Sequence, residues 1–286
     1  MTGTKCSKKN PHHMHELIIE SGRTEKNYWR DLWRFRELFY FLAWRDILVR
    51  YKQTVIGVAW AVVRPFLTMV VLTMVFSRIA KLPAPGSMPY ALLVMAAMLP
   101  WQFFATSLSE ASNSLVGNSN VISKIYFPRL IIPAGSVITA FLDFLIALVL
   151  MSAVMLWYRF LPDWRVFLVP GFVMLAFACS FGGGLWLCAL NVEYRDFRYI
   201  VPFIVQFGIY ISPVGFSSSV VPEKWRMLYS LNPMVGVIEG FRWCLLRGET
   251  PLQVSALVSS VSVTAVLCLS GIWYFRKMER TFADVI

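Results

Sequence analysis

Charged residues are scarce in this chain of 286 residues. Asp, Glu, Lys and Arg make up only 15% of it, whereas hydrophobic residues make up 57%. A soluble domain carries about 25% charged residues, so the composition excludes an ordinary soluble protein. Several apolar runs of about twenty residues predict membrane-spanning helices, because about that many residues are needed to cross about 30 Å of hydrocarbon.

Motifs for nucleotide binding and catalysis are also missing. The sequence contains no G-x-x-x-x-G-K-[ST] phosphate loop, no G-x-S-x-G and no H-E-x-x-H. We therefore expect no catalytic residue, and the protein should not be an enzyme. The glycine cluster FGGGL, residues 181–185, lies inside an apolar run. Small residues let helices approach closely there, so helix packing is its expected role.

Cysteine and histidine are too few and too scattered to build a site. The five cysteines are widely spaced, and none forms a C-x-x-C pair, which excludes a disulfide framework and a cysteine metal cage. His12, His13 and His15 lie in a tail rich in Lys and Asn, without a carboxylate or cysteine cage. We expect no metal site. No secretory signal is expected either, because no small-residue cleavage site follows a short apolar core.

Basic residues are in excess, and the formal net charge is +11. They are dispersed along the edges of the apolar runs, which favours membrane topology over nucleic-acid binding. Six spans are predicted, at residues 55–78, 90–115, 131–158, 166–190, 199–216 and 253–275. The connections on the side of the two termini hold 18 Lys and Arg, and the opposite connections hold 8. The positive-inside rule therefore places both termini in the cytoplasm.

Residues 28–50 alternate aromatic and cationic side chains at helical spacing. One face of the predicted helix would carry Trp29, Leu32, Trp33 and Phe39, and another Arg30, Arg34 and Glu37. This pattern is typical of an amphipathic helix lying on a membrane. A soluble helix packed on a partner is the alternative.

A second unusual segment, residues 217–252, is long for a turn on the outer side. Within it, residues 231–248 read as a helix that follows Pro233 and stops at Gly248. Glu239 and Arg242 interrupt its apolar character. We therefore predict a re-entrant hairpin or a pair of short helices rather than a span.

Three charges fall inside predicted spans, where charge is costly and needs a reason. Asp143 lies about 18 Å into the third span at 1.5 Å per residue, and Arg64 and Glu110 lie nearer the cytosolic side. One hypothesis is structural: Arg64 pairs with Glu110 or with Asp143 and locks helices together. The other is that these groups line a hydrophilic path.

Aromatic residues also fall well inside a span, at the stretch LPWQFF. Trp101, Phe103 and Phe104 follow Pro100 there. Sugar rings have apolar C–H faces that can slide on aromatic rings, although plain helix packing would use the same residues. A path for sugars and a packed helix interface both remain possible.

Several motifs resemble one family. Residues 45–66, RDILVRYKQTVIGVAWAVVRPF, look like the opening signature of ABC-2 type permeases. Residues 118–133, 189–216, 221–234 and 240–243 are similar, in the same order, to the subgroup that exports bacterial polysaccharides such as O antigen, capsule and teichoic acid. Residues 1–27 match nothing in this pattern.

The resemblance implies an all-α integral membrane subunit with six spans, which dimerises with itself above two copies of a separate cytosolic ATPase. ATP and Mg²⁺ would be bound by that ATPase, and this chain would hold no cofactor. The implied organisation is a cytosolic tail (1–27), an interfacial helix (28–50), a transmembrane domain (51–275) and a second cytosolic tail (276–286). The location would be the bacterial inner membrane.

The resemblance also implies two short coupling helices that dock on the ATPase, one in each of two cytosolic turns. We name residues 119–129, SNVISKIYFPR, the first elbow and residues 191–198, NVEYRDFR, the second elbow. The coupling residues would be Ser123, Lys124, Ile125, Tyr126, Glu193, Tyr194, Arg195, Asp196, Phe197 and Arg198. The charges would orient the docking, and the aromatic rings would anchor it.

Two further sets of residues are candidates for transport. The substrate path would include Trp60, Arg64, Trp101, Phe103, Phe104, Glu110 and Asp143. The outward gate would include Pro233, Glu239, Phe241, Arg242 and Trp243. ATP-driven closure of the partners would push on the elbows, and a lipid-linked glycan would move between two six-helix halves.

The preferred function is therefore export of a lipid-linked polysaccharide, with O antigen ahead of capsule and teichoic acid. A drug or lipid exporter of the same permease type is the first alternative. A membrane glycosyltransferase is a remote one, because Glu223, Glu239 and Glu249 on the outer segment are spaced like ordinary surface acids.

Overall fold

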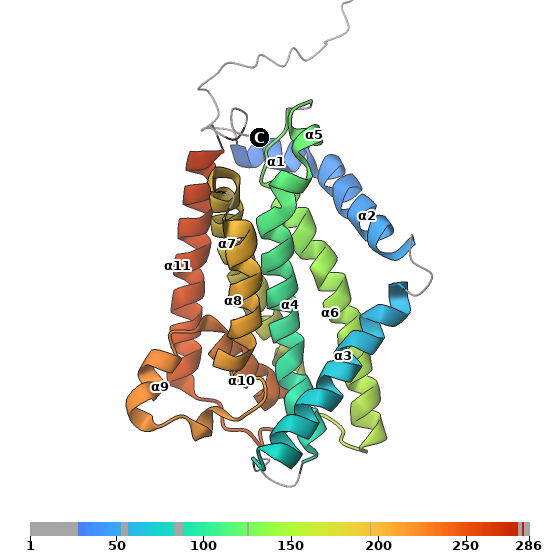
Figure 1. The fold of residues 1–286 in the computed structure, drawn as a ribbon, viewed down its shortest axis with the longest axis vertical. Helices are drawn as coiled ribbons and strands as arrows, with labels where there is room; N and C mark the ends of the chain where they lie inside the picture. Colours follow the sequence, from blue (N-terminus) through green and yellow to red (C-terminus); the bar gives the residue numbers. More distant parts are fainter. Residues whose placement is uncertain are drawn as a thin grey trace, which may run out of the picture.

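The protein is a bundle of long helices in the computed structural model (Figure 1). The structure describes residues 28–52, 57–82, 88–124, 126–194, 196–279 and Phe282, and these contain helices, turns and loops but no strand. The expectation of an all-α membrane protein is confirmed at this level. The predicted tail of residues 1–27, including its histidines, lies outside the described residues, as do Ile125 and Arg195.

Within the described residues, five helical segments are long and apolar enough to cross a membrane. They are α3 (Gly57–Thr73) continued by the π-helix η1 (Met74–Ile79), α4 (Tyr90–Gly117), α6 (Ile131–Trp157), the 3-10 helix η2 (Trp164–Leu168) continued by α7 (Val169–Glu193), and α11 (Val254–Met278). Each corresponds to a predicted span. Pro65 does not interrupt the first of them, because α3 continues through it.

The remaining predicted span, 199–216, is represented by a shorter helix. Helix α8 (Phe197–Ile211) has 15 residues, which makes it about 22 Å long at 1.5 Å per residue. Residues 212–216, which we name the post-α8 segment, are not helical. A full crossing takes about 30 Å, so the six-span count stays a prediction.

Helix α4 is the centre of the bundle and contacts α3, α6, α7, α8 and α10. Its residues from Tyr90 to Trp101 are buried almost without a break. A helix that is apolar on all sides belongs in an interior. Helices α7 and α11 approach at their backbones: a Cβ atom added to Gly182 would lie 2.6 Å from the Cα of Cys268. The packing role expected for the glycine cluster is confirmed at Gly182.

The predicted interfacial helix is two helices, α1 (Tyr28–Arg34) and α2 (Arg36–Lys52), with a turn at Phe35. Leu32 and Phe39 pack on the bundle, whereas Trp29 and Trp33 are exposed. The four residues therefore do not share one face as expected. Leu32 and Phe39 face the bundle, and the two tryptophans point away from it. A position on the membrane surface stays a prediction.

The short helices lie at the two ends of the bundle (Figure 1). Helix α1, α5 (Ser119–Ile122) and the last turns of α11 lie together at one end, drawn at the top. Three short helices follow the post-α8 segment toward the other end: η3 (Ser218–Val220), α9 (Glu223–Tyr229) and α10 (Pro233–Leu245). Helix α10 packs between α4, α7 and α11. Residues 217–252 thus contain short helices as expected, α9 and α10 with the three-residue η3 before them, and their position on the outer side stays a prediction.

Candidate functional site

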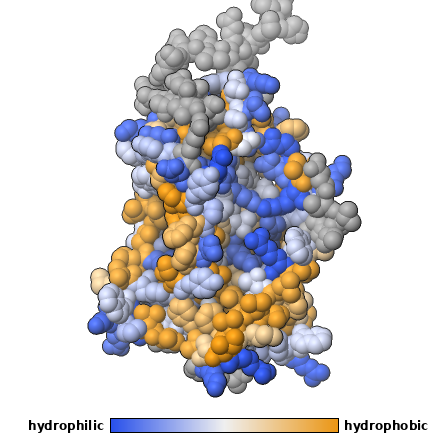
Figure 2. Space-filling view, in the orientation of Figure 1, coloured by the Kyte–Doolittle hydropathy of each residue, from blue (hydrophilic) through white to orange (hydrophobic). Residues whose placement is uncertain are grey.

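A cavity of about 980 Å³ opens between α3, α4, α6 and α8, and we name it the central cavity. The end of α2 contributes Arg50 and Tyr51 to its wall. Figure 2 shows hydrophilic atoms gathered on the face between α2 and α3, above an apolar surface. The polar side chains of the wall include Gln102, Thr106, Ser109 and Gln206, and the rings include Trp60, Trp101, Phe103, Phe144 and Tyr210.

One arginine in the wall joins three helices. Arg50 of α2 places its Nη1 atom 3.0 Å from Oδ2 of Asp143 on α6, and its Nη2 atom donates to Oε1 of Glu110 on α4. The hydroxyl of Tyr51 donates to the Asp143 carboxylate as well. All three charged side chains are about 30% exposed. The cluster therefore ties the end of α2 to α4 and α6, with two carboxylates around one guanidinium.

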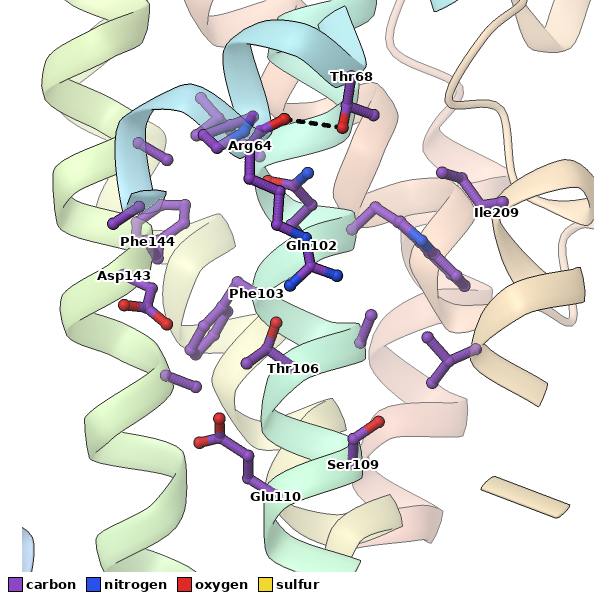
Figure 3. A pocket seen from close by; sticks show the side chains of 18 of the residues that line it. Arg64, Thr68, Gln102, Phe103, Thr106, Ser109, Glu110, Asp143, Phe144 and Ile209 are labelled. Carbon is purple, nitrogen blue, oxygen red and sulfur yellow. Dashed lines mark hydrogen bonds between the residues drawn. The ribbon is translucent and has the colours of Figure 1, made fainter. Parts of the chain in front are cut away.

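The predicted partner for these carboxylates was wrong. Arg64 forms no ion pair within the part of the chain that the structure describes, and Arg50 takes the place assigned to it. In Figure 3, Arg64 lies on α3, and Glu110 lies at the far end of the view on α4. Arg50 was missed because residues 28–50 were assigned to the membrane surface. The Arg50–Tyr51 pair within the family signature at residues 45–66 was the sequence signal that could have identified Arg50 as a site residue.

Six of the seven path candidates meet at the central cavity: Trp60, Arg64, Trp101, Phe103, Glu110 and Asp143. Phe104 is absent from the wall and packs beside Trp101, with ring centres 5.6 Å apart. Trp60 is 63% exposed, but Phe103 is only 2% exposed and packs among Phe141, Phe144 and Phe177. The exposed rings are therefore better placed than Phe103 to meet a transported molecule.

Both elbows lie at the end of the bundle that holds α1 (Figure 1). The first contains the four-residue helix α5, followed by Ser123, Lys124 and an exposed Tyr126. In the second, Glu193 ends α7 and Phe197 begins α8, so the described residues there form no separate short helix. The rings of Tyr194 and Phe197 are 6.5 Å apart. Exposed rings and charges together suit a protein-docking surface.

Each elbow is hydrogen-bonded to the end of α11. In the first, the Arg129 amide donates to Oε1 of Glu279 at 2.8 Å, and its Nη1 atom donates to the Glu279 carbonyl at 2.6 Å. Burial raises the pKa of the Glu279 carboxyl, and the bond from the Arg129 amide opposes this rise. In the second elbow, the Tyr274 hydroxyl donates to Glu193 at 3.5 Å. A movement of either elbow would therefore also displace the end of α11 through these hydrogen bonds.

The outward-gate candidates all belong to α10. Pro233 is its first residue, and the side chain of Asn232 caps the helix by accepting from the Met234 amide at 3.0 Å. Glu239, Phe241 and Arg242 are buried, at 7%, 0% and 1% exposure. The Arg165 guanidinium lies over the Trp243 ring, 5.0 Å from its centre. These residues are therefore interior to the fold rather than on a free surface.

Comparison with known proteins places the chain in a family. Residues 37–246 match the family model described as "ABC-2 type transporter". This match covers most of the chain, so the protein belongs to the ABC-2 type transporter family, and it is a multi-pass membrane protein of that family.

Individual relatives are more specific. The chain is 26% identical over 259 residues to the O-antigen export system permease protein RfbA of Myxococcus xanthus, which covers 90% of this chain and 98% of the relative. It is 26% identical over 245 residues to RfbA of Klebsiella pneumoniae, covering 85% and 92%. The polysialic acid transport protein KpsM of Escherichia coli is 22% identical over 243 residues, covering 82% and 91%.

Proposed function

We propose that this chain is the membrane permease subunit of an ABC exporter that moves a lipid-linked polysaccharide across the bacterial inner membrane. O antigen is the first candidate for the polysaccharide. The observation that carries the proposal is the similarity to two O-antigen export permeases along nearly their whole length. The 25% identity over 207 residues to the capsule polysaccharide export inner-membrane protein CtrC of Neisseria meningitidis makes a capsule polysaccharide the second candidate.

The permease works as a homodimer with two copies of a cytosolic ATPase, which bind ATP and Mg²⁺. The chain has no phosphate-binding loop of its own, in keeping with a separate ATPase. The elbows lie at the cytosolic side with both termini, and α8 acts as the sixth span. Exposed charges and rings at the elbows, including Tyr126 and Tyr194, support docking there. Membrane lipids surround the apolar outer surface.

The central cavity is the part of each subunit that meets the glycan. Its wall combines rings with amide, hydroxyl and charged groups, which suits sugar rings with an apolar face and polar edges. Contacts of this kind are adaptable and separately weak. A long polymer needs that property, because each sugar must bind and leave in turn.

Reversing the charges of the second elbow should separate the subunit from its ATPase. We expect the double variant Arg195→Glu, Asp196→Lys to insert in the membrane normally but to lose ATPase co-purification and polymer export, because complementary charges orient docking. Quantitative pull-down of the ATPase and immunoblotting of exported polymer measure the two effects.

The matched control reverses an adjacent acid–base pair at the opposite end of the molecule, Glu223→Lys with Lys224→Glu on α9, where Glu223 is exposed. It should leave ATPase binding unchanged. Normal export by the Arg195, Asp196 variant would contradict docking at this elbow, and polymer export without any ATPase would contradict the proposed function.

Removing an exposed ring from the central cavity should slow export. Trp60→Ala removes a side chain that is 63% exposed and lines the wall. A lost ring contact is worth about 1 kcal/mol, which corresponds to about a fivefold lower rate. Trp60→Phe should restore most of it. Pulse-labelled polymer arriving outside the inner membrane is the measurement.

The control for this prediction is Trp157→Ala. Trp157 is 85% exposed but lies at the end of α6, outside the cavity wall. Its replacement should not change the export rate. Equal rates for Trp60→Ala and Trp157→Ala would contradict contact between the cavity and the glycan.

A further inference from the structure

Helix α8 ends beside a buried segment that is not helical, and burying such backbone is energetically costly. Helix α8 stops at Ile211, and residues 212–215 of the post-α8 segment are buried without being helical. Buried backbone carbonyls outside regular structure need other donors, and at membrane depth no water replaces them. Pro213 favours the end of the helix, and the partners of this segment decide how its carbonyls are satisfied.

Side chains supply those donors at three consecutive carbonyls. Arg242 Nη2 donates to the Val214 carbonyl at 3.0 Å, and its Nη1 donates to the Phe216 carbonyl at 2.8 Å. Between them, the Tyr90 hydroxyl donates to the Gly215 carbonyl at 2.6 Å. These carbonyls are thus held by one residue of α10 and one of α4, and Asn232, which caps α10, also donates to the Ser212 hydroxyl at 3.0 Å.

Arg242 also reaches α4 directly. Its Nε atom donates to the Leu93 carbonyl in the first turn of α4 at 3.2 Å. One guanidinium therefore joins three parts of the fold, and it does so with the side chain only 1% exposed. A planar fork with several fixed donors can do this, whereas the single ammonium of lysine cannot span the three acceptors in the same geometry.

We name the three hydrogen bonds of Arg242, to the carbonyls of Leu93, Val214 and Phe216, the clamp. The clamp lies beside the central cavity. Ile209 and Tyr210 of α8 are part of the cavity wall, and the clamped segment starts two residues later. Leu99 of α4 is also in the wall, less than two turns after Leu93. The segment that Arg242 holds therefore begins where the α8 part of the cavity wall ends, on the side of α9 and α10.

We propose that Arg242 is the positioning residue that keeps this end of the central cavity closed, by clamping α10, the post-α8 segment and the first turn of α4 together. The proposal rests on the proposed export function for the meaning of the cavity, but the clamp itself is independent of which polymer is carried. Opening the cavity at this end requires the three arginine bonds to be exchanged or broken.

Thiol accessibility tests the clamp without measuring export. Val214→Cys, in a chain whose native cysteines are replaced by alanine, places one thiol on the clamped segment, where Val214 is 1% exposed. The complex with its ATPase, in spheroplasts, is treated with a membrane-impermeant maleimide. With Arg242 present, we expect slow labelling. With Arg242→Gln, we expect labelling about tenfold faster, because two donors to this segment are lost.

Two further variants separate the clamp from general misfolding. Arg242→Lys keeps the charge and one donor and should give intermediate labelling with normal co-purification of the ATPase. Arg247→Gln, at an exposed arginine that also donates to a loop carbonyl near the same end, should label as slowly as the parent. If the Arg242→Gln complex fails to assemble, the labelling rate of the Arg242→Lys complex decides whether the clamp exists.

Slow labelling of Val214→Cys in an assembled Arg242→Gln or Arg242→Lys complex would overturn the proposal, as would equally fast labelling in Arg247→Gln. Failure of the proposed function has a different signature, because a parent complex that exports no polymer can still show fast labelling on loss of Arg242. The two ideas therefore stand or fall on separate measurements.

Discussion

Replacing Arg50 by alanine should detach the end of α2 from the bundle and abolish export. The variant leaves Glu110 and Asp143 facing each other in a partly buried wall without the guanidinium that joins them. Removing one partner of such a cluster leaves uncompensated charge. Since the groups are about 30% exposed, solvent screens part of the effect. We expect a loss of about 2 kcal/mol in stability, measured by thermal unfolding of the purified complex.

A triple variant distinguishes this cause from the loss of a side chain. Arg50→Ala with Glu110→Gln and Asp143→Asn removes all three charges and replaces the two carboxylates by carboxamides of similar shape. It should recover most of the lost stability, since replacing a whole charged cluster is much less costly than breaking it. If the single and triple variants unfold at the same temperature, the cluster does not hold α2. Protease cleavage within α2 gives a second measure of detachment.

Gly182→Ala should disrupt the bundle at the contact between α7 and α11. The added Cβ would lie 2.6 Å from the Cα and 2.7 Å from the amide nitrogen of Cys268, and these are backbone atoms that cannot rotate away. The helices must move apart. Overpacking of this kind costs about 1–3 kcal/mol or more, so we expect the melting temperature to fall by about 5 °C or more.

The neighbouring glycine provides the control. A Cβ added to Gly183 would meet only the Cδ1 atom of Leu108, at 3.2 Å, and a leucine side chain can move by that small amount. Gly183→Ala should therefore melt close to the parent. Similar melting of the Gly182 and Gly183 variants would show that the backbone contact between α7 and α11 is not tight. Both variants change the hydropathy of α7 by the same Gly→Ala step, so membrane insertion should not differ between them.

The membrane class and most helix positions could be predicted because they depend on local properties. Crossing the bilayer requires a run of apolar residues of sufficient length, and that requirement is visible in α4, α6, α7 and α11 without any knowledge of packing. The helix predicted within residues 231–248 also rested on local signals, a start at Pro233 and a stop at Gly248, and it is present as α10. Family membership also follows from motifs that can be read along the chain.

The end of α8 at Ile211 was not predicted. The apolar run continues through residues 212–216, and a hydropathy pattern does not distinguish a helical residue from a buried irregular one. The helix can stop because Arg242 and Tyr90, which are distant in the sequence, supply donors to the freed carbonyls. Pro213, two residues after the last helical residue, is the local signal that the span prediction passed over, because proline disfavours helical backbone at the residue before it.

By itself, the sequence determined that this protein is a helical membrane protein, where its long helices lie, and which family motifs it carries. The tertiary structure alone decided which charges meet. Arg50 pairs with Glu110 across 60 positions of the chain, and Arg64, the partner expected from span positions, does not. Ion pairs depend on how helices pack against one another, and the order of residues in one helix does not specify which neighbour it faces.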